Sequence, residues 1–170
     1  MWRTDRICAR NASELGSAGR GVRILAGAEI TAPHRIEVGD NVHIGTGAFI
    51  RAEGGLKIGD HTHISRNLLL YTMNHDVEGE WLPYGAAIIA KPVVIGRNVW
   101  IGMNVCIAPG TTIGDGAIIG MGTVVAGTVP PMAIVASQPW RTIGHRDATH
   151  YEELDQLGRH RGASGQLFDN

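Results

Sequence analysis

The chain has 170 residues and a formal net charge of −1, and its residues are 44% apolar but only 5% aromatic. This length supports one domain with a sizeable core, which must be built mainly from aliphatic side chains. The near balance of charges gives no electrostatic case for nucleic-acid binding, and the chain has neither a run of about 18 apolar residues for a membrane span nor an apolar secretory signal. We therefore expect a cytoplasmic protein in which Cys8 and Cys106 are reduced thiols.

Aliphatic residues recur at every sixth position along most of the chain. They are Ile24, Ile30, Ile36, then Val38, Ile44, Ile50, then Ile58, Ile64, Leu70, then Ile95, Ile101, Ile107, Ile113, Ile119 and Val125. A small residue follows most of them, and a small or β-branched residue comes four positions later, the last one being Val129. A helix needs a period near 3.6 and a half-buried strand a period near 2, so neither explains this spacing. The spacing fits a short strand and a corner, repeated three times per coil, with the coils stacked as parallel strands.

The predicted fold is therefore all-β, a single-stranded parallel β-helix of about five coils over residues 24–143. Residues 1–23 are expected to form an N-terminal segment that caps the column. Two-residue insertions interrupt the period before Val38 and at Leu56–Lys57. Each buried aliphatic side chain contributes about 1.5–3 kcal/mol, which is enough to stabilise such a column with few aromatic residues.

The period fails over residues 71–94, which carry His75, Trp81 and Tyr84. An excursion of this length from a repetitive column is more often functional than accidental. This segment is therefore the first place to look for catalytic residues.

The repeat fails again after Pro130–Pro131, and residues 144–170 are predicted to form a short helix and a mobile tail. The helix is expected over residues 147–157, because this stretch starts with Asp147, has acidic early residues and is followed by Gly158.

The stretch VVIGRNVWIGMNVCIAPGTTIGDGAIIGMGTVVAGTVPPMAIVASQPWRTIG, at residues 93–144, resembles hexapeptide-repeat acetyltransferases of the galactoside, maltose and polysaccharide O-acetyltransferase type. The most specific parts of the resemblance are Asn74-His75, VWIG at 99–102, PGTTIGDGA at 109–117 and QPWR at 138–141. The string MNHDVEG at 73–79 is also similar to xenobiotic acetyltransferases, which modify antibiotics.

The resemblance implies left-handed winding of the column, which the period by itself does not supply. It also implies a homotrimer that binds acetyl-CoA in the groove between neighbouring columns and uses no metal. Acyl transfer to a hydroxyl needs a base that takes the proton while the oxygen attacks the thioester. Histidine suits this task near neutral pH, and His75 matches the catalytic histidine of the family. A carboxylate or a carbonyl is expected to hold its far ring nitrogen, with Asp76, Glu78 and Glu80 as equal candidates nearby.

Four residues are expected near the acceptor. Asn74 either hydrogen-bonds the acceptor or shapes the turn. Trp100 takes the last position of its hexad and should point outward, and the resemblance places it beside the active site. Trp81 and Tyr84 either form a wall against the acceptor or pack the excursion onto the next subunit.

Carried over position by position, the resemblance places coenzyme A along the backbone edges of successive coils. The contacts fall at Gly102, Met103, Gly120, Met121, Ala126, Gly127 and Arg141. Arg141 would meet a phosphate or the adenine. Met121 stands where relatives commonly have a small residue, and Gly127 where they often have Lys. The missing Lys removes one phosphate partner unless Arg146, or Arg97 of a neighbouring chain, replaces it.

The sequence thus predicts an acetyl-CoA-dependent O-acetyltransferase that acts on a hydroxyl of a sugar or glycoconjugate. The alternative within the enzyme class is a xenobiotic acetyltransferase. A γ-type carbonic anhydrase shares the fold and needs zinc ligands, and His61-x-His63 would offer a pair on one strand face, but the closely spaced His pair of that family is absent. A non-catalytic scaffold is the remaining alternative, and it has no use for Asn74-His75.

Overall fold

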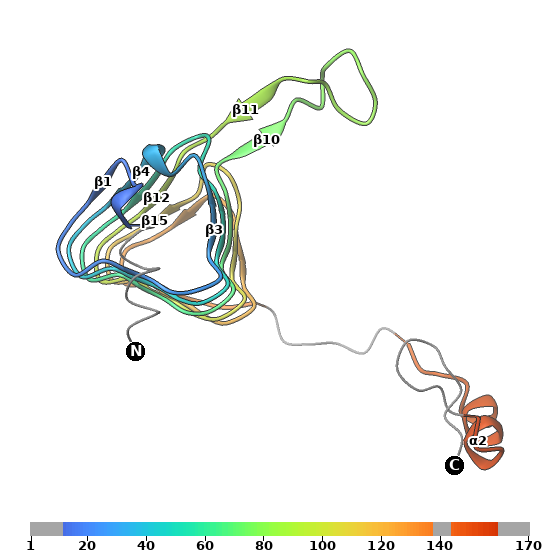
Figure 1. Cartoon of the computed structure of the whole chain (residues 1–170). Helices are drawn as coiled ribbons and strands as arrows, with labels where there is room; N and C mark the ends of the chain where they lie inside the picture. The colour runs from blue at the N-terminus through green and yellow to red at the C-terminus, as the bar shows by residue number, and fades with distance from the viewer. Residues whose placement is uncertain (1–11, 138–143, 160–170) are drawn as a thin grey trace. The chain divides into compact units, whose positions relative to one another are not determined.

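The computed structural model describes residues 12–137 and 144–159. Residues 12–137 wind into a three-sided column of parallel strands, which Figure 1 shows along its axis. Sheet A contains β1 (Ser17–Ala18), β4 (Ile36–Val38), β7 (Leu56–Ile58), β12 (Val93–Ile95), β15 (Thr112–Ile113) and β18 (Thr128–Val129). Sheet B contains β2 (Arg23–Ile24), β5 (His43–Ile44), β8 (His63–Ile64), β13 (Trp100–Ile101), β16 (Ile118–Ile119) and β19 (Ile134–Val135). Sheet C contains β3 (Glu29–Thr31), β6 (Phe49–Arg51), β9 (Leu69–Tyr71), β14 (Cys106–Ile107) and β17 (Val124–Val125).

This architecture confirms the predicted β-helix and is consistent with left-handed winding. The chain visits sheets A, B and C in turn, so each coil contributes one strand to each sheet. The described residues complete five coils and add two strands of a sixth, β18 and β19. The first strand of the column, β1, lies ahead of the first aliphatic residue of the period and pairs in parallel with β4.

The aliphatic period produces the core because it places one inward side chain on every strand. On sheet B, for example, Ile44 lies opposite Ile64, and Ile64 opposite Ile101. All three are fully buried. The two-residue insertions in the sequence have a simple outcome, since they lengthen the strands of sheet A, so that Ile36 and Val38 both point inward from β4.

One position differs from the predicted pattern. Val129, predicted at a corner, lies in β18 opposite Ile113 and takes an inward place in the ladder of sheet A. The reason is a short corner, because only Ala126 and Gly127 separate β17 from β18, whereas four residues separate β14 from β15.

Residues 144–159 are described by themselves. They contain the helix α2 (Ala148–Gln156), close to the predicted bounds, and the side chain of Asp147 caps it by accepting a hydrogen bond from the backbone N–H of His150 at 3.0 Å. In the part of the chain that the structure describes, no helix is long and apolar enough to cross a membrane.

The stability of the column can be tested on two neighbours in β12 that point to opposite sides. Ile95 is buried in the core, whereas Val94 is partly exposed on the outside. Ile95→Ala is expected to lower the free energy of unfolding by about 2–5 kcal/mol, because it leaves a cavity between close-packed rungs. Val94→Ala, the matched control, should change it by no more than about 0.5 kcal/mol. Urea unfolding followed by circular dichroism measures both, and equal losses would contradict the inward and outward assignment.

Candidate functional site

The excursion forms an antiparallel ribbon, β10 (Met73–His75) and β11 (Ile88–Ala90), closed by the loop 76–87. It leaves the column between β9 of sheet C and β12 of sheet A and projects outward from that corner (Figure 1). At the base of the loop, the Asp76 carbonyl accepts a hydrogen bond from the Gly85 N–H at 2.8 Å, and the Asp76 N–H donates to Ala87 at 3.1 Å. The ribbon therefore holds the predicted excursion in a defined conformation.

His75 lies at the end of β10, opposite Ile88, with its side chain exposed. Its imidazole stacks on the ring of Tyr84, with 3.9 Å between the ring centroids and 14° between the planes. The side chain of Asn74 accepts a hydrogen bond from the backbone N–H of His75 at 3.3 Å. The excursion thus presents a solvent-accessible imidazole whose face is covered by Tyr84.

The predicted orienting carboxylate is not found. Asp76 Oδ1 accepts a hydrogen bond from the Glu78 backbone N–H at 3.0 Å, so its side chain shapes the loop instead. Among the described residues, no hydrogen bond from Asp76, Glu78 or Glu80 reaches the His75 ring. The reason is local, because a tight loop turns these side chains onto its own backbone or into solvent.

The excursion carries an unusual number of exposed apolar side chains. Trp81 is 73% exposed and Leu82 is 97% exposed. The other members of this apolar excursion surface are Val77, Tyr84, Ile88 and Ile89. Contiguous exposed apolar residues commonly mark an interaction site.

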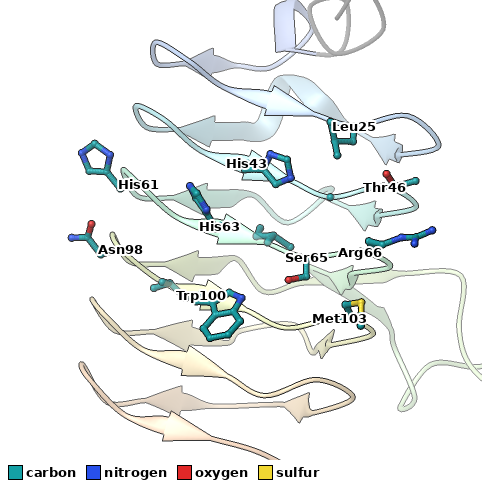
Figure 2. A pocket seen from close by; sticks show the side chains of 13 residues that line it. Leu25, His43, Thr46, His61, His63, Ser65, Arg66, Asn98, Trp100 and Met103 are labelled. Carbon is teal, nitrogen blue, oxygen red and sulfur yellow. The ribbon is translucent and has the colours of Figure 1, made fainter. Parts of the chain in front are cut away.

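A groove of about 840 Å³ runs along the outside of sheet B. Figure 2 shows His43, His63 and Trp100 above one another on successive strands, as their backbone register requires. Trp100 is 57% exposed and points outward, as its hexad position predicts. Burial lowers the pKa of the half-buried His43, and the nearby charges of His63 and Arg23 lower it further.

The predicted coenzyme A contacts lie at two different corners. Gly102 and Met103 follow sheet B, and Gly120 and Met121 occupy the same corner one coil later. The coils approach closely there, since a Cβ added to Gly102 would lie 2.6 Å from the backbone nitrogen of Met121. Gly102 is therefore required by the stacking of the coils, whatever its role toward a ligand.

The second set, Ala126 and Gly127, lies at the short corner between sheets C and A. Both residues are exposed, and Gly127 has a φ of 76°, which favours glycine. A Cβ added to Gly127 would meet nothing within 4 Å, so space for a ligand is open there.

Arg141 lies outside the described residues. The two candidate replacements for the missing phosphate partner have contacts of their own. Arg97 pairs with Asp115, with Nε 3.2 Å from Oδ2, at the corner between sheets A and B. The guanidinium of Arg146 lies 5.0 Å from the centre of the Tyr151 ring.

One chain does not bring His75 and Trp100 together. The excursion leaves the corner between sheets C and A, and in a three-sided column that corner faces away from the outside of sheet B (Figure 1). His75 and Tyr84 thus form one group on the excursion, which also carries Trp81, and Trp100 with Met103 forms another.

The histidines of sheet B have a different arrangement from the predicted pair. His61 lies at a corner with a φ of 59°, beside Asn41, whose Nδ2 is 3.2 Å from His61 Nδ1. His63 lies on the strand β8, so the two do not share a strand face. Within residues 12–137 and 144–159, no group of three His, Cys, Asp or Glu side chains is placed to hold a metal ion. His63 instead lies opposite His43, which is twenty residues earlier and one coil away. Three hexads and a two-residue insertion give this spacing, so the repeat in the sequence is the signal that could have found the pair.

The comparisons with known proteins agree with this architecture. The family model described as bacterial transferase hexapeptide (six repeats) matches residues 92–127. None of the curated protein sequences compared with the chain matches it.

Among solved structures, a hexapeptide-repeat-containing acetyltransferase of Vibrio cholerae in complex with acetyl-coenzyme A is 28% identical, with a TM-score of 0.69 over 84% of this chain and 76% of that one. Galactoside acetyltransferase in complex with coenzyme A is 24% identical, with a TM-score of 0.69 over 95% of this chain and 76% of that one. AntD, an N-acyltransferase from Bacillus cereus in complex with dTDP and 3-hydroxybutyryl-CoA, is 23% identical, with a TM-score of 0.61 over 88% and 93%. The last two likenesses establish the fold.

Proposed function

Since this chain is a hexapeptide-repeat protein with the fold of the hexapeptide acetyltransferases, we propose that it is an acyltransferase that moves the acetyl group of acetyl-CoA to a hydroxyl of a sugar or glycoconjugate. The observation that carries the proposal is the exposed imidazole of His75, presented on a ribbon where the chain leaves the repeat. A non-catalytic scaffold gives no reason for such a ribbon. The proposal places the reaction in the cytoplasm, where Cys106 stays a reduced thiol.

In the proposed reaction, His75 is the general base. The acceptor oxygen attacks the thioester carbon while the imidazole takes the hydroxyl proton. When the tetrahedral intermediate collapses, the carbon–sulfur bond breaks and the leaving thiolate recovers this proton, which gives the acetyl ester and free coenzyme A. Tyr84, stacked on the imidazole, supports this role by restricting the orientation of the ring. Asn74 is proposed to shape the ribbon end and to contact the acceptor.

The proposed active site lies between copies of the chain in a homotrimer. Two features support this assembly. First, the apolar excursion surface is too exposed for an isolated column. Second, the outer sides of the three sheets differ. The outer ladder of sheet A is mostly polar, with Ser17, Glu37, Lys57, Val94, Thr112 and Thr128. Sheet C has one mostly apolar outer ladder, with Glu29, Phe49, Leu69, Cys106 and Val124, and a shorter, more polar one beside it, with Thr31, Arg51 and Tyr71.

In such a trimer, the excursion of one copy reaches sheet B of the next, so that His75 faces the neighbour's groove. Trp100 then offers its exposed ring to the apolar face of a sugar or to the donor. Coenzyme A is proposed to follow the corners at Gly102, Met103, Gly120 and Met121, with Ala126, Gly127 and Arg141 at its far end. The two residue groups that lie apart in one chain are thereby united.

The proposal predicts that the purified protein releases free thiol from acetyl-CoA only when a suitable acceptor is present. A colorimetric thiol assay with free sugars, glycosides, amino sugars and aminoglycoside antibiotics as acceptors measures this. Release with hydroxyl sugars, together with a mass increase of one acetyl group in the product, is the expected result. Release with amines or antibiotics alone would show that the acceptor belongs to this alternative class and is not a sugar hydroxyl. Hydration of carbon dioxide by the zinc-loaded protein, without thiol release, would contradict the transferase.

A further inference from the structure

The ionisable side chains that line the groove on sheet B are all basic. Its lining contains basic or titratable side chains and no acidic ones. The residues that line it are Leu25, His43, Gly45, Thr46, His61, His63, Ile64, Ser65, Arg66, Asn98, Val99, Trp100 and Met103. Arg23 adds a further charge, because it lies next to His43 in the same outer ladder. The chain as a whole has a net charge of −1, so this local excess of positive groups does not follow from composition.

We infer that this groove recognises an acceptor that carries an anionic group, a phosphate or a carboxylate, between His43 and His63, while its sugar ring lies toward Trp100. The inference rests on the proposed transferase function and names the acceptor class. A neutral sugar has no charge for the histidine pair to bind, whereas an anion can accept a hydrogen bond from each ring.

The spacing of the two rings suits one anion. His43 and His63 lie on β5 and β8, with 5.9 Å between the ring centroids and 49° between the ring planes. Charge-assisted N–H···O bonds are about 2.7–2.9 Å long, so the oxygens of a single phosphate or carboxylate can accept from both rings. The 5.9 Å separation lies within the range of aromatic contacts and follows from the register of β5 and β8, so the two rings lie side by side in the groove without a ligand.

Trp100 follows the pair directly, one coil further along the same ladder, as Figure 2 shows. A ligand that reaches from His43 past His63 to Trp100 therefore meets charge at one end and an aromatic face at the other. This order fits a sugar that bears an anionic substituent, since an aromatic ring covers the apolar face of a sugar and leaves its polar groups free.

The titration of His43 supports this assignment. Its pKa is lowered by burial and by the positive charges of His63, which faces it from β8, and Arg23, which faces it from β2. The carboxylates of Asp40 and Asp60 lie at the corner between sheets A and B, where Asp40 is paired with Arg20 at 2.8 Å and also interacts with the charge of His61. An anion between the rings would offset this repulsion and raise the pKa of His43. Because the anion prefers the protonated ring, its binding should take up protons and strengthen as the pH falls.

The test compares glucose, glucuronate and glucose 1-phosphate as acceptors with acetyl-CoA at about pH 6 and about pH 8. The expected kcat/KM for at least one of the two anionic sugars exceeds that for glucose by about tenfold or more at the lower pH, which corresponds to one charge-assisted hydrogen bond. Glucuronate carries a carboxylate at C6 and glucose 1-phosphate a phosphate at C1, so the better acceptor shows which of these two anionic groups and positions the groove accepts.

The variant His43→Gln/His63→Gln should lower kcat/KM for the anionic sugars far more than that for glucose and so abolish the preference. His34 is an exposed histidine on the 3-10 turn η1 (Pro33–Arg35). The variant His34→Gln is the matched control and should keep the preference. The single variant His63→Arg retains a positive charge beside His43 and should therefore keep the preference in part. Equal kcat/KM for neutral and anionic sugars, or an undiminished preference in the double variant, would overturn the inference.

A second measurement separates this inference from the transferase activity. Glucose 1-phosphate, or inorganic phosphate alone, is added to the protein without acetyl-CoA, and the imidazole resonances of His43 and His63 are followed by NMR. Both should shift with the anions and not with glucose. If no sugar is acetylated but these shifts occur, the transferase proposal fails and the anion site stands. If the shifts do not occur, the anion site fails whatever the acetylation assay gives.

Discussion

The variant His75→Ala is expected to lower the kcat of acetyl transfer by about 10²–10⁴-fold, the usual contribution of a general base. The KM for acetyl-CoA should change little, because the imidazole touches the reacting hydroxyl and not the body of the donor. His75→Gln should behave in the same way, since an amide of similar size and polarity does not take a proton at neutral pH. Thiol release under saturating acetyl-CoA and acceptor measures the effect.

The control for this experiment is His34→Ala, which removes an exposed imidazole far from the excursion in sequence and should retain full activity. Light scattering on each variant establishes that the assembly is unchanged. Because the stack of His75 on Tyr84 is a surface contact, loss of activity by unfolding is not expected, and thermal melting checks this. A His75→Ala enzyme that turns over as fast as the parent would show that another group is the base.

Mixing two inactive variants is expected to restore activity. His75 and Trp100 lie on opposite sides of one column, so a site that needs both must take them from neighbouring copies. When His75→Ala and Trp100→Ala chains are unfolded together in equal amounts and refolded, some interfaces receive an intact His75 from one copy and an intact Trp100 from the next. In a randomly assembled cyclic trimer this applies to about one quarter of the sites.

The expected activity of the mixture is therefore about a quarter of the parent's, against the low residual activity of either variant alone. The double variant His75→Ala/Trp100→Ala, refolded with parent protein in the same way, is the matched control. It also leaves about one quarter of the sites intact but adds no new combination of inactive chains. A mixture with no more activity than the mean of the two variants would place both residues in one chain's site, and light scattering that gives a monomer mass would remove the shared site altogether.

The fold was predictable because every coil buries its own inward residue. A ladder such as Ile44, Ile64 and Ile101 requires the same residue class in each coil, so the packing produces a regular period in the sequence. The first strand, β1, was missed because Ser17–Ala18 contributes small, exposed residues at the end of the column and carries no aliphatic signal. Val129 was misassigned because a corner of two residues shifts the register, and the length of a corner is not part of the period.

The candidate site was predictable in part. The loss of the period located the excursion, and the motif within it singled out His75, which lies exposed on the ribbon. The contact of His75 with Tyr84 and the absence of a carboxylate partner within the described residues were not foreseen, because the path of a loop depends on local backbone bonds such as those of Asp76. For the same reason, the sequence did not distinguish among Asp76, Glu78 and Glu80 as partners of His75.

The sequence by itself determined that this chain is a three-sided column and where the chain leaves it, because burial of one aliphatic side chain per strand is a short-range, repeated requirement. Only the tertiary structure decided which residues share a side of that column. The stacking of coils brings His43 beside His63 and Trp100, and it sends the excursion from the opposite corner. These neighbours are separated by whole coils whose lengths vary with each insertion and corner, so their proximity follows from the register of the strands and not from the period.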